Sequence, residues 1–308
     1  MNKSVIYQQR RVELAKLICA KTGGGIAIIT TAPETARNRD SEFPYRHDSD
    51  FFYLSGFEEP GATLVLKVSS DGQLESHLFC RPKDAEREIW DGIRLGPEAA
   101  PAVLGVEFAH SNKTLDQKLG ELLADQEAIY IRLAESAEAD RRLRHWMKQV
   151  RGQARAGINP PSEFHDIECL IHEMRLLKDP HEIDTMRKAA AISARAHVRA
   201  MQMCKPGMRE YQIEAELLHE FRNSGAQSVA YNSIVAGGAN SCILHYRAGS
   251  TELRSGELCL IDAGCELDGY ASDITRTFPV NGKFSGPQLV LYDITLAAQE
   301  ASIAMTKP

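Results

Sequence analysis

Several features are scarce in this 308-residue sequence, and each excludes a class of protein. The seven cysteines are odd in number and form no Cys-x-x-Cys pair, which argues against a disulfide framework and a zinc ribbon. No apolar run approaches the roughly 20 residues of a membrane span, and the charged N-terminus is a poor signal peptide. The formal net charge is -6 without any block of Lys and Arg, which disfavours nucleic-acid binding. We therefore expect a cytoplasmic protein with neither a nucleic-acid nor a membrane partner.

The sequence does contain a mixture of strand and helix patterns. Short apolar runs bounded by glycine or turn residues predict strands at 25–30, 63–68 and 76–80. Amphipathic segments between and around these runs predict helices. This alternation indicates an α/β domain over residues 1–173.

Residues 174–308 begin with helices and continue into a strand-rich tail. Asp179 is a good N-cap, and Pro180 suits the first helical position. Spacings of three and four then mark one apolar stripe, which predicts the buried face of a long helix. The members of this stripe are Ile183, Met186, Ala190, Ala194, Val198 and Met201.

Two aspartates on adjacent predicted strands are the most informative residues. Leu258, Leu260 and Asp262 share one face by the period of two, so a carboxylate ends an apolar row. A glycine-bounded turn leads into the next strand, where Asp273 can lie opposite Asp262. Two carboxylates forced together in a dry site repel, and Mn²⁺, Mg²⁺ or Zn²⁺ would relieve that repulsion. In the alternative interpretation, both are turn or strand-edge residues bonded to the backbone.

The motifs around these aspartates resemble a known family. Asp-Ala-Gly begins at Asp262, and Asp-Ile-Thr-Arg-Thr-Phe-Pro begins eleven positions later at Asp273, as in metallopeptidases of the creatinase or pita-bread fold. The resemblance implies that these are two of five ligands, which hold two Mn²⁺ ions in a complete site. It places a His and two Glu ligands beyond Pro308. We therefore expect a truncated chain with an incomplete α+β pita-bread domain and doubtful peptidase activity of its own.

The N-terminal half resembles the N-terminal domain of the Xaa-Pro aminopeptidases, which is of the creatinase N-terminal type. The motifs that carry this resemblance lie at residues 37–57 and 88–96, and Ile-Leu-His-Tyr at 243–246 extends it. Methionine aminopeptidases lack such a domain, and creatine amidinohydrolase lacks the metal-binding acids. Prolidase is the closest competitor.

Two residues of this half are candidates for substrate binding. The resemblance implies that Trp90 approaches the active site of a neighbouring subunit, whereas a Trp near a turn is more often a core cap. It also implies that Arg155 reaches toward substrate, although its neighbourhood would equally suit a solvated basic loop. For Arg46, His47 and Asp48 we favour a structural role, because most such charges satisfy local partners.

His245 is the candidate catalytic residue. It follows two apolar residues in a predicted strand after the Gly237-Gly238 turn, where a buried structural histidine is the common case. The resemblance places it beside the metals in contact with substrate. A neutral imidazole there can donate to a developing oxyanion.

The resemblance implies a homo-oligomeric metalloaminopeptidase that cleaves the bond between an N-terminal residue and a penultimate proline. Its partners would be peptides with proline in the second position. Two alternatives remain open. One is a prolidase-type dipeptidase, and the other is a non-catalytic peptide-binding or interaction module of the same fold.

Overall fold

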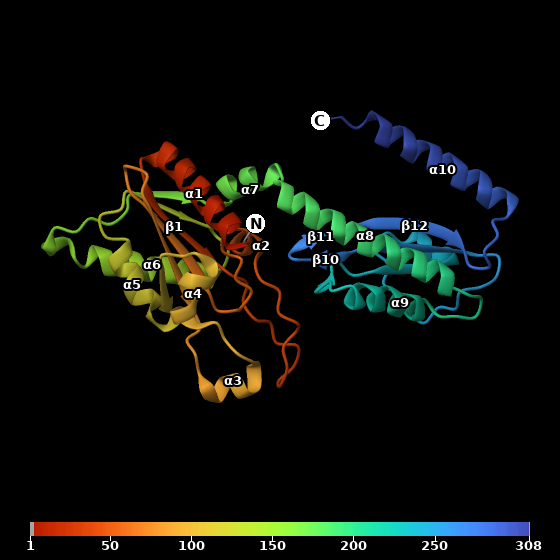
Figure 1. Cartoon of the computed structure of the whole chain (residues 1–308), viewed down its shortest axis with the longest axis horizontal. Helices are drawn as coiled ribbons and strands as arrows, with labels where there is room; N and C mark the ends of the chain where they lie inside the picture. The colour runs from red at the N-terminus through yellow and green to blue at the C-terminus, as the bar shows by residue number, and fades with distance from the viewer. Residues whose placement is uncertain (1–2, 308) are drawn as a thin grey trace. The chain divides into compact units, whose positions relative to one another are not determined.

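A computed structural model describes residues 3–307 as two compact units, one ending at Leu177 and the other beginning at Lys178. This division lies close to the boundary expected at residue 173. Each unit buries its own apolar core, and Figure 1 traces the chain through both. None of the helices in residues 3–307 is long and apolar enough to cross a membrane.

The first unit is built on a six-stranded mixed sheet with the order β4-β3-β2-β1-β5-β6. The central strand β1 runs antiparallel to β2 and parallel to β5, while the outer strands β4 and β6 pair in parallel with β3 and β5. The strands are β1 (Gly25–Thr30), β2 (Thr63–Val68), β3 (Leu74–Cys80), β4 (Phe108–Ser111), β5 (Ala128–Ile131) and β6 (Glu163–Asp166).

Helices cover both faces of this sheet. Ala27 and Ile29 of β1 join the core that includes α1, α2, α4 and α7, whereas Ile26 and Ile28 face α5 and α6. Alternate residues of one strand thus enter opposite cores, as the pleat requires. The helices are α1 (Lys3–Thr22), α2 (Ser49–Ser55), α3 (Ala85–Asp91), α4 (Gly96–Leu104), η1 (Asn112–Thr114), α5 (Leu115–Leu122), α6 (Ala137–Arg151), η2 (Ala154–Ala156) and α7 (Glu168–Leu176).

The second unit packs two long helices, α8 and α9, against small sheets (Figure 1). One three-stranded sheet has the order β11-β10-β7 and the other β12-β9-β8. The elements are α8 (Pro180–Met203), α9 (Glu210–Asn223), β7 (Ser228–Val229), β8 (Ile234–Gly237), η3 (Gly238–Cys242), β9 (Leu258–Ala263), β10 (Cys265–Leu267), β11 (Tyr270–Ala271), β12 (Ile274–Pro279) and α10 (Gly286–Met305).

The start of α8 was predicted correctly, but its buried face was not. Asp179 forms a capping box with Glu182, and Pro180 occupies the first helical position. Ile183 and Val198 of the predicted stripe are 38% and 52% exposed. The buried face consists instead of Glu182, Thr185, Ala189, Ile192, Ser193, Ala196, His197 and Ala200. Small and polar residues therefore face the sheets, because they allow close approach and hydrogen bonding.

Candidate metal centre

Asp262 and Asp273 lie close together on the same face of the sheet β12-β9-β8. Alternate residues of β9 are buried against the helices, and Asp262 shares the opposite, half-buried face with Leu258 and Leu260, as predicted. The register pairs Asp262 with Thr275, so Asp273 lies diagonally across the two strands rather than directly opposite.

A tyrosine hydroxyl joins the two carboxylates. The Oη atom of Tyr231 donates to Oδ1 of Asp262 at 2.5 Å and lies 2.9 Å from Oδ1 of Asp273. Burial and these two carboxylates raise the pKa of Tyr231 above its usual value, so the phenol remains protonated. Sequence reasoning missed this residue, because an isolated Tyr between Ala230 and Asn232 carries no motif.

The pair of carboxylates is not as dry as expected. Asp262 is half-buried and Asp273 is exposed. Across residues 3–307, neither carboxylate forms an ion pair with Lys, Arg or His, and a single neutral hydroxyl bridges two negative charges. Such a pair of hard oxygen ligands without a compensating cation fits a divalent metal ion.

A close backbone crossing between the aspartates permits this arrangement. A Cβ atom on Gly264 would lie 1.6 Å from the carbonyl oxygen of Ser272, so only glycine fits there. The crossing brings the end of β9 against the start of β12, and each aspartate lies within two residues of it.

His245 does not lie in a strand, which corrects the prediction. After β8 the chain forms the short helix η3, and His245 follows in an exposed turn. His245 is itself exposed, as is the neighbouring Leu244, which contradicts the alternative of a buried core histidine. The β-strand prediction failed because residues 243–245, which follow η3, form a bend and a turn instead of extended backbone.

A fully buried carboxylate anchors the loop that carries His245. Oε1 of Glu210 accepts hydrogen bonds from the backbone N–H of Gly237 at 2.9 Å and from Nδ2 of Asn240 at 2.9 Å. Oε2 accepts from the hydroxyl of Tyr246 at 2.8 Å and from the N–H of Gly249 at 3.0 Å. Four donors from residues 237–249 therefore converge on one side chain of α9.

The two predicted substrate-binding residues of the first unit are exposed. Trp90 lies on α3 with 81% of its surface exposed, next to the equally exposed Ile89, so it caps no core of this unit. Arg155 lies in the exposed 3₁₀ turn η2. Both positions are accessible, and their roles in substrate binding stay predictions.

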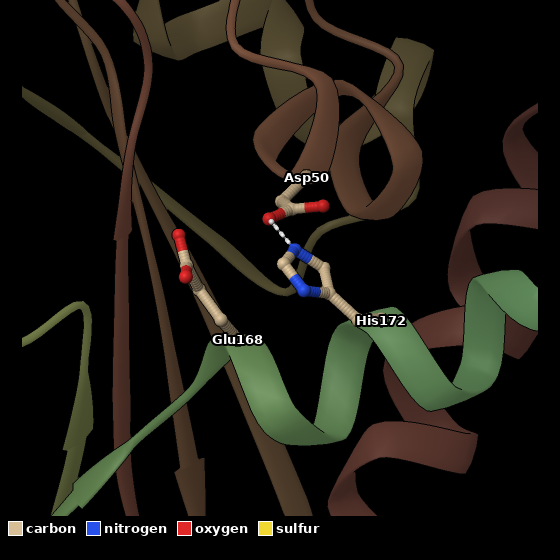
Figure 2. A group of neighbouring side chains, drawn as sticks. All are labelled: Asp50, Glu168 and His172. Atoms are coloured by element: carbon tan, nitrogen blue, oxygen red, sulfur yellow. Dashed lines mark ion pairs between the residues drawn. The ribbon is translucent and has the colours of Figure 1, made fainter.

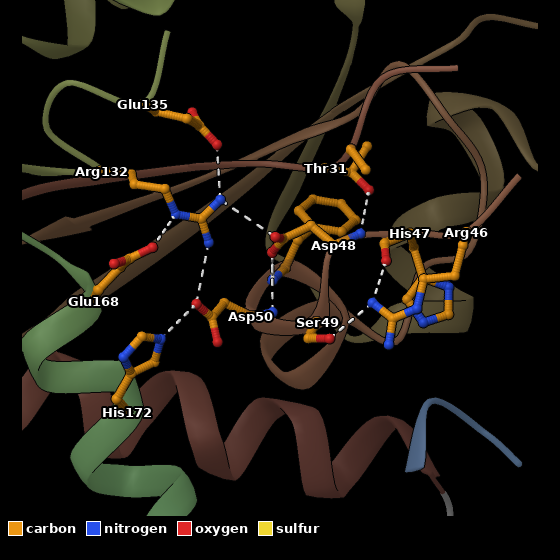
Figure 3. A network of polar contacts seen from close by, with 12 residues as sticks. Thr31, Arg46, His47, Asp48, Ser49, Asp50, Arg132, Glu135, Glu168 and His172 are labelled. Atoms are coloured by element: carbon orange, nitrogen blue, oxygen red, sulfur yellow. Dashed lines mark hydrogen bonds and ion pairs between the residues drawn. The ribbon is translucent and has the colours of Figure 1, made fainter. Parts of the chain in front are cut away.

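Local contacts agree with the structural role favoured for Arg46, His47 and Asp48. Asp48 caps α2 by accepting from the N–H groups of Asp50 and Phe51. The ring of His47 stacks on a phenylalanine of α2, and Arg46 donates to the His47 carbonyl and to the Ser49 hydroxyl (Figure 3).

A second group of potential metal ligands lies in the first unit, where no motif had indicated it. Asp50, Glu168 and His172 bring their ligand atoms within 4.8 Å of one another, from α2 and α7 (Figure 2). Nε2 of His172 lies 3.3 Å from the Oδ2 atom of Asp50.

Arginine already compensates this group. The guanidinium of Arg132 contacts Asp48, Asp50, Glu135 and Glu168 (Figure 3), and Arg175 pairs with the other oxygen of Asp50. Paired charges of this kind satisfy the carboxylates without a metal. We interpret the group as an ion-pair network that ties α7 to α2 and to the end of β5.

Comparisons with known proteins agree with these two units. The family model of the aminopeptidase P N-terminal domain matches residues 7–130, and the family model of metallopeptidase family M24 matches residues 184–308. The Xaa-Pro aminopeptidase of Escherichia coli is 46% identical over 98% of this chain, and that of Haemophilus influenzae is 42% identical over 89%.

The solved structures agree as well. Zinc-substituted E. coli aminopeptidase P in complex with product and proline aminopeptidase P II from Yersinia pestis both superpose with a TM-score of 0.95, over 99% of this chain and 69% of theirs. Their sequence identities to this chain are 46% and 48%. The chain spans 68% of the E. coli relative and 61% of the Haemophilus relative. The chain belongs to the Xaa-Pro aminopeptidase family, within the M24 metallopeptidases.

Proposed function

We propose that this chain supplies the substrate-binding and part of the metal-binding machinery of an Xaa-Pro aminopeptidase. The observation that carries the proposal is the convergence of Asp262 and Asp273 on the hydroxyl of Tyr231, at the family's metal-binding motif. The relatives named above are Xaa-Pro aminopeptidases, which favours this activity over a prolidase-type dipeptidase or a non-catalytic module.

Asp262 and Asp273 would hold divalent metal ions, and we propose two Mn²⁺ per complete site. When bound, such ions would lower the pKa of a water molecule and polarise the scissile carbonyl. Tyr231 keeps the two carboxylates together and remains a hydrogen-bond donor at neutral pH, because its pKa is raised.

His245 would act on the substrate from the loop anchored by Glu210. Its exposed imidazole is available to donate a hydrogen bond to the oxyanion that develops at the attacked carbonyl. Four hydrogen bonds to Glu210 restrain this loop. Restraint lowers the entropic cost of placing the imidazole for catalysis.

We further propose that Trp90 and Arg155 contact substrate in a homo-oligomer. The exposed Trp90 and Ile89 offer an apolar surface to a neighbouring subunit. Light scattering of the complete protein tests this proposal. A strictly monomeric state would contradict the role of Trp90 in a neighbouring active site.

The proposal can be tested with a chimera. The chain is fused to the part of the E. coli relative that its match does not cover and is assayed with Mn²⁺ on Ala-Pro-Ala and on the dipeptide Ala-Pro. We expect cleavage of the tripeptide and its loss in Asp273→Ala. Cleavage of Ala-Pro alone would indicate a dipeptidase, and a folded but inactive chimera would contradict the proposal. The 308-residue chain by itself, which contributes only two of the five expected ligands, should not cleave either peptide.

A further inference from the structure

Two buried polar residues of α8 face the strands that carry the aspartates. Ser193 is fully buried and His197 is 2% exposed, although both lie on a helix whose other buried residues are mostly small and apolar. They are four residues apart and therefore point from the same face of the helix. Buried polar groups at such a position require partners. The hydrogen bonds of these two side chains go to β9, to β10 and to Ser272, which precedes Asp273.

Ser193 binds the backbone crossing between the two aspartates. Its hydroxyl accepts from the N–H of Cys265 at 3.0 Å and lies 2.8 Å from the hydroxyl of Ser272. The Ser272 hydroxyl in turn bonds to the N–H and the carbonyl of Cys265, at 3.1 Å and 2.9 Å. Ser272 immediately precedes Asp273, so this network fixes the backbone next to one predicted ligand.

His197 bonds to the backbone next to Asp262 and lies near the backbone next to Asp273. Its Nε2 atom lies 3.1 Å from the carbonyl oxygen of Ala263, the residue after Asp262. The imidazole also lies near the backbone of Ile274, the residue after Asp273, although its buried Nδ1 atom forms no hydrogen bond within the described residues. Ala263 and Ile274 are partners in the strand register, so one side chain contacts both strands at the point where the aspartates emerge on the opposite face.

We propose that Ser193 and His197 are positioning residues, which hold the backbones on either side of Asp262 and Asp273 so that the two carboxylates converge on one divalent-metal site. This inference rests on the proposed function, because it assigns a purpose to the spacing of the predicted ligands. The two residues of α8 contact the buried face of the strands, whereas the carboxylates lie on the opposite face. Outer contacts of this kind orient metal ligands and typically change metal affinity by about 10- to 100-fold when removed.

The test uses Mn²⁺ alone as the probe and the 308-residue chain. His197→Leu removes the N–H donor at similar volume, whereas His197→Gln keeps an N–H near the position of Nε2. Ile192→Val is the matched control, since Ile192 is a buried neighbour on α8 that packs in the apolar core. Free Mn²⁺ is counted by electron paramagnetic resonance, and amide hydrogen exchange of residues 263–274 is followed by mass spectrometry.

We expect His197→Leu to weaken Mn²⁺ binding about tenfold and to speed exchange at residues 263–274. His197→Gln should restore most of both, and Ile192→Val should leave affinity unchanged even if it lowers the Tm. Unaltered affinity in a folded His197→Leu variant would overturn the inference while leaving the function intact.

Failure of the proposed function itself has a different signature. Asp273→Asn would then bind Mn²⁺ as the unmodified chain does. If two of the five ligands are too few for the 308-residue chain, neither protein will bind Mn²⁺ measurably. In that case the exchange data decide the inference alone. Faster exchange at residues 263–274 in His197→Leu than in Ile192→Val would support backbone positioning, and equal exchange would refute it.

Discussion

The two units each bring carboxylates together, but they compensate the charge in different ways. In the first unit, Asp48, Asp50, Glu135 and Glu168 surround the guanidinium of Arg132. In the second unit, Asp262 and Asp273 share only the neutral hydroxyl of Tyr231. Distance between ligand atoms alone would favour the first group as a metal site.

Charge compensation reverses that ranking. A cation entering the first group would have to displace two arginines from Asp50, which is almost completely buried. A cation entering the second group would meet two uncompensated carboxylates and displace at most a hydroxyl. A cluster of carboxylates is therefore a metal-site candidate only after its existing cations have been counted.

The largest expected effect comes from removing the shared cation of the first unit. Arg132→Met leaves four carboxylates with Arg175, which pairs with Asp50, and should lower the free energy of unfolding by about 3 kcal/mol. Both tryptophans lie in this unit, so Trp fluorescence in a urea titration reports its unfolding. Arg141→Gln, which removes an exposed ion pair, is the control and should change stability by less than about 0.5 kcal/mol. Equal stability of the two variants would show that the ion pairs of Arg132 do not stabilise the first unit.

Glu210 extends the comparison to a carboxylate that neutral donors satisfy. Glu210→Gln places an amide N–H₂ against donors such as the N–H of Gly249, and it should destabilise the second unit by about 2 kcal/mol. Hydrogen exchange should accelerate over residues 238–249, the loop that carries His245. Glu216→Gln on the same helix is the control, because Glu216 is partly exposed and pairs only at the surface with Arg199. Unchanged exchange in that loop would contradict the anchoring role of Glu210.

A matched pair of substitutions tests whether removal of a carboxylate charge changes the stability of the two units in opposite directions. Asp50→Asn removes a charge held by two arginines and should destabilise the first unit by about 1.5 kcal/mol. Asp273→Asn removes like-charge repulsion, so in metal-free buffer it should stabilise the second unit by about 0.5 kcal/mol. Calorimetry in the presence of EDTA measures both. A loss of stability in Asp273→Asn would mean that the two carboxylates do not repel as we infer.

Much of the fold followed from local patterns. The strand at 63–68 and the capped start of α8 were predicted at their observed bounds, because alternation and capping are local signals. The shared face of Leu258, Leu260 and Asp262 was also predicted from the period of two. The two aspartates themselves were recognised as candidate metal ligands through a motif rather than through burial.

The remainder depended on contacts between residues distant in sequence. Tyr231 reaches Asp273 across 42 positions, and Arg132 reaches Asp50 across 82, so neither pairing leaves a local trace. The buried face of α8 was assigned wrongly because the apolar stripe was weighed by hydrophobicity alone. Ser193 and His197 are buried through hydrogen bonds to the sheets, which periodicity does not reveal.

The smallest expected effect concerns pH and follows from that misassigned face. Burial lowers the pKa of His197 below its ordinary value of 6.5, so the unfolded chain binds this proton before the folded chain does. The stability that the neutral imidazole contributes is therefore fully present above pH 6.5 and is lost as the pH falls from there toward the lower folded pKa. In that pH window, the slope of the unfolding free energy against pH should reflect one proton that His197 binds on unfolding. His197→Gln should remove this contribution from the second unit. Hydrogen exchange of β9 at several pH values isolates this unit from the first, whose paired His77 and His110 also have lowered pKa values because they are buried. A slope in β9 that His197→Gln leaves unaltered would assign the acid sensitivity to other groups, and α8 would then hold the aspartate strands by packing rather than through a neutral histidine.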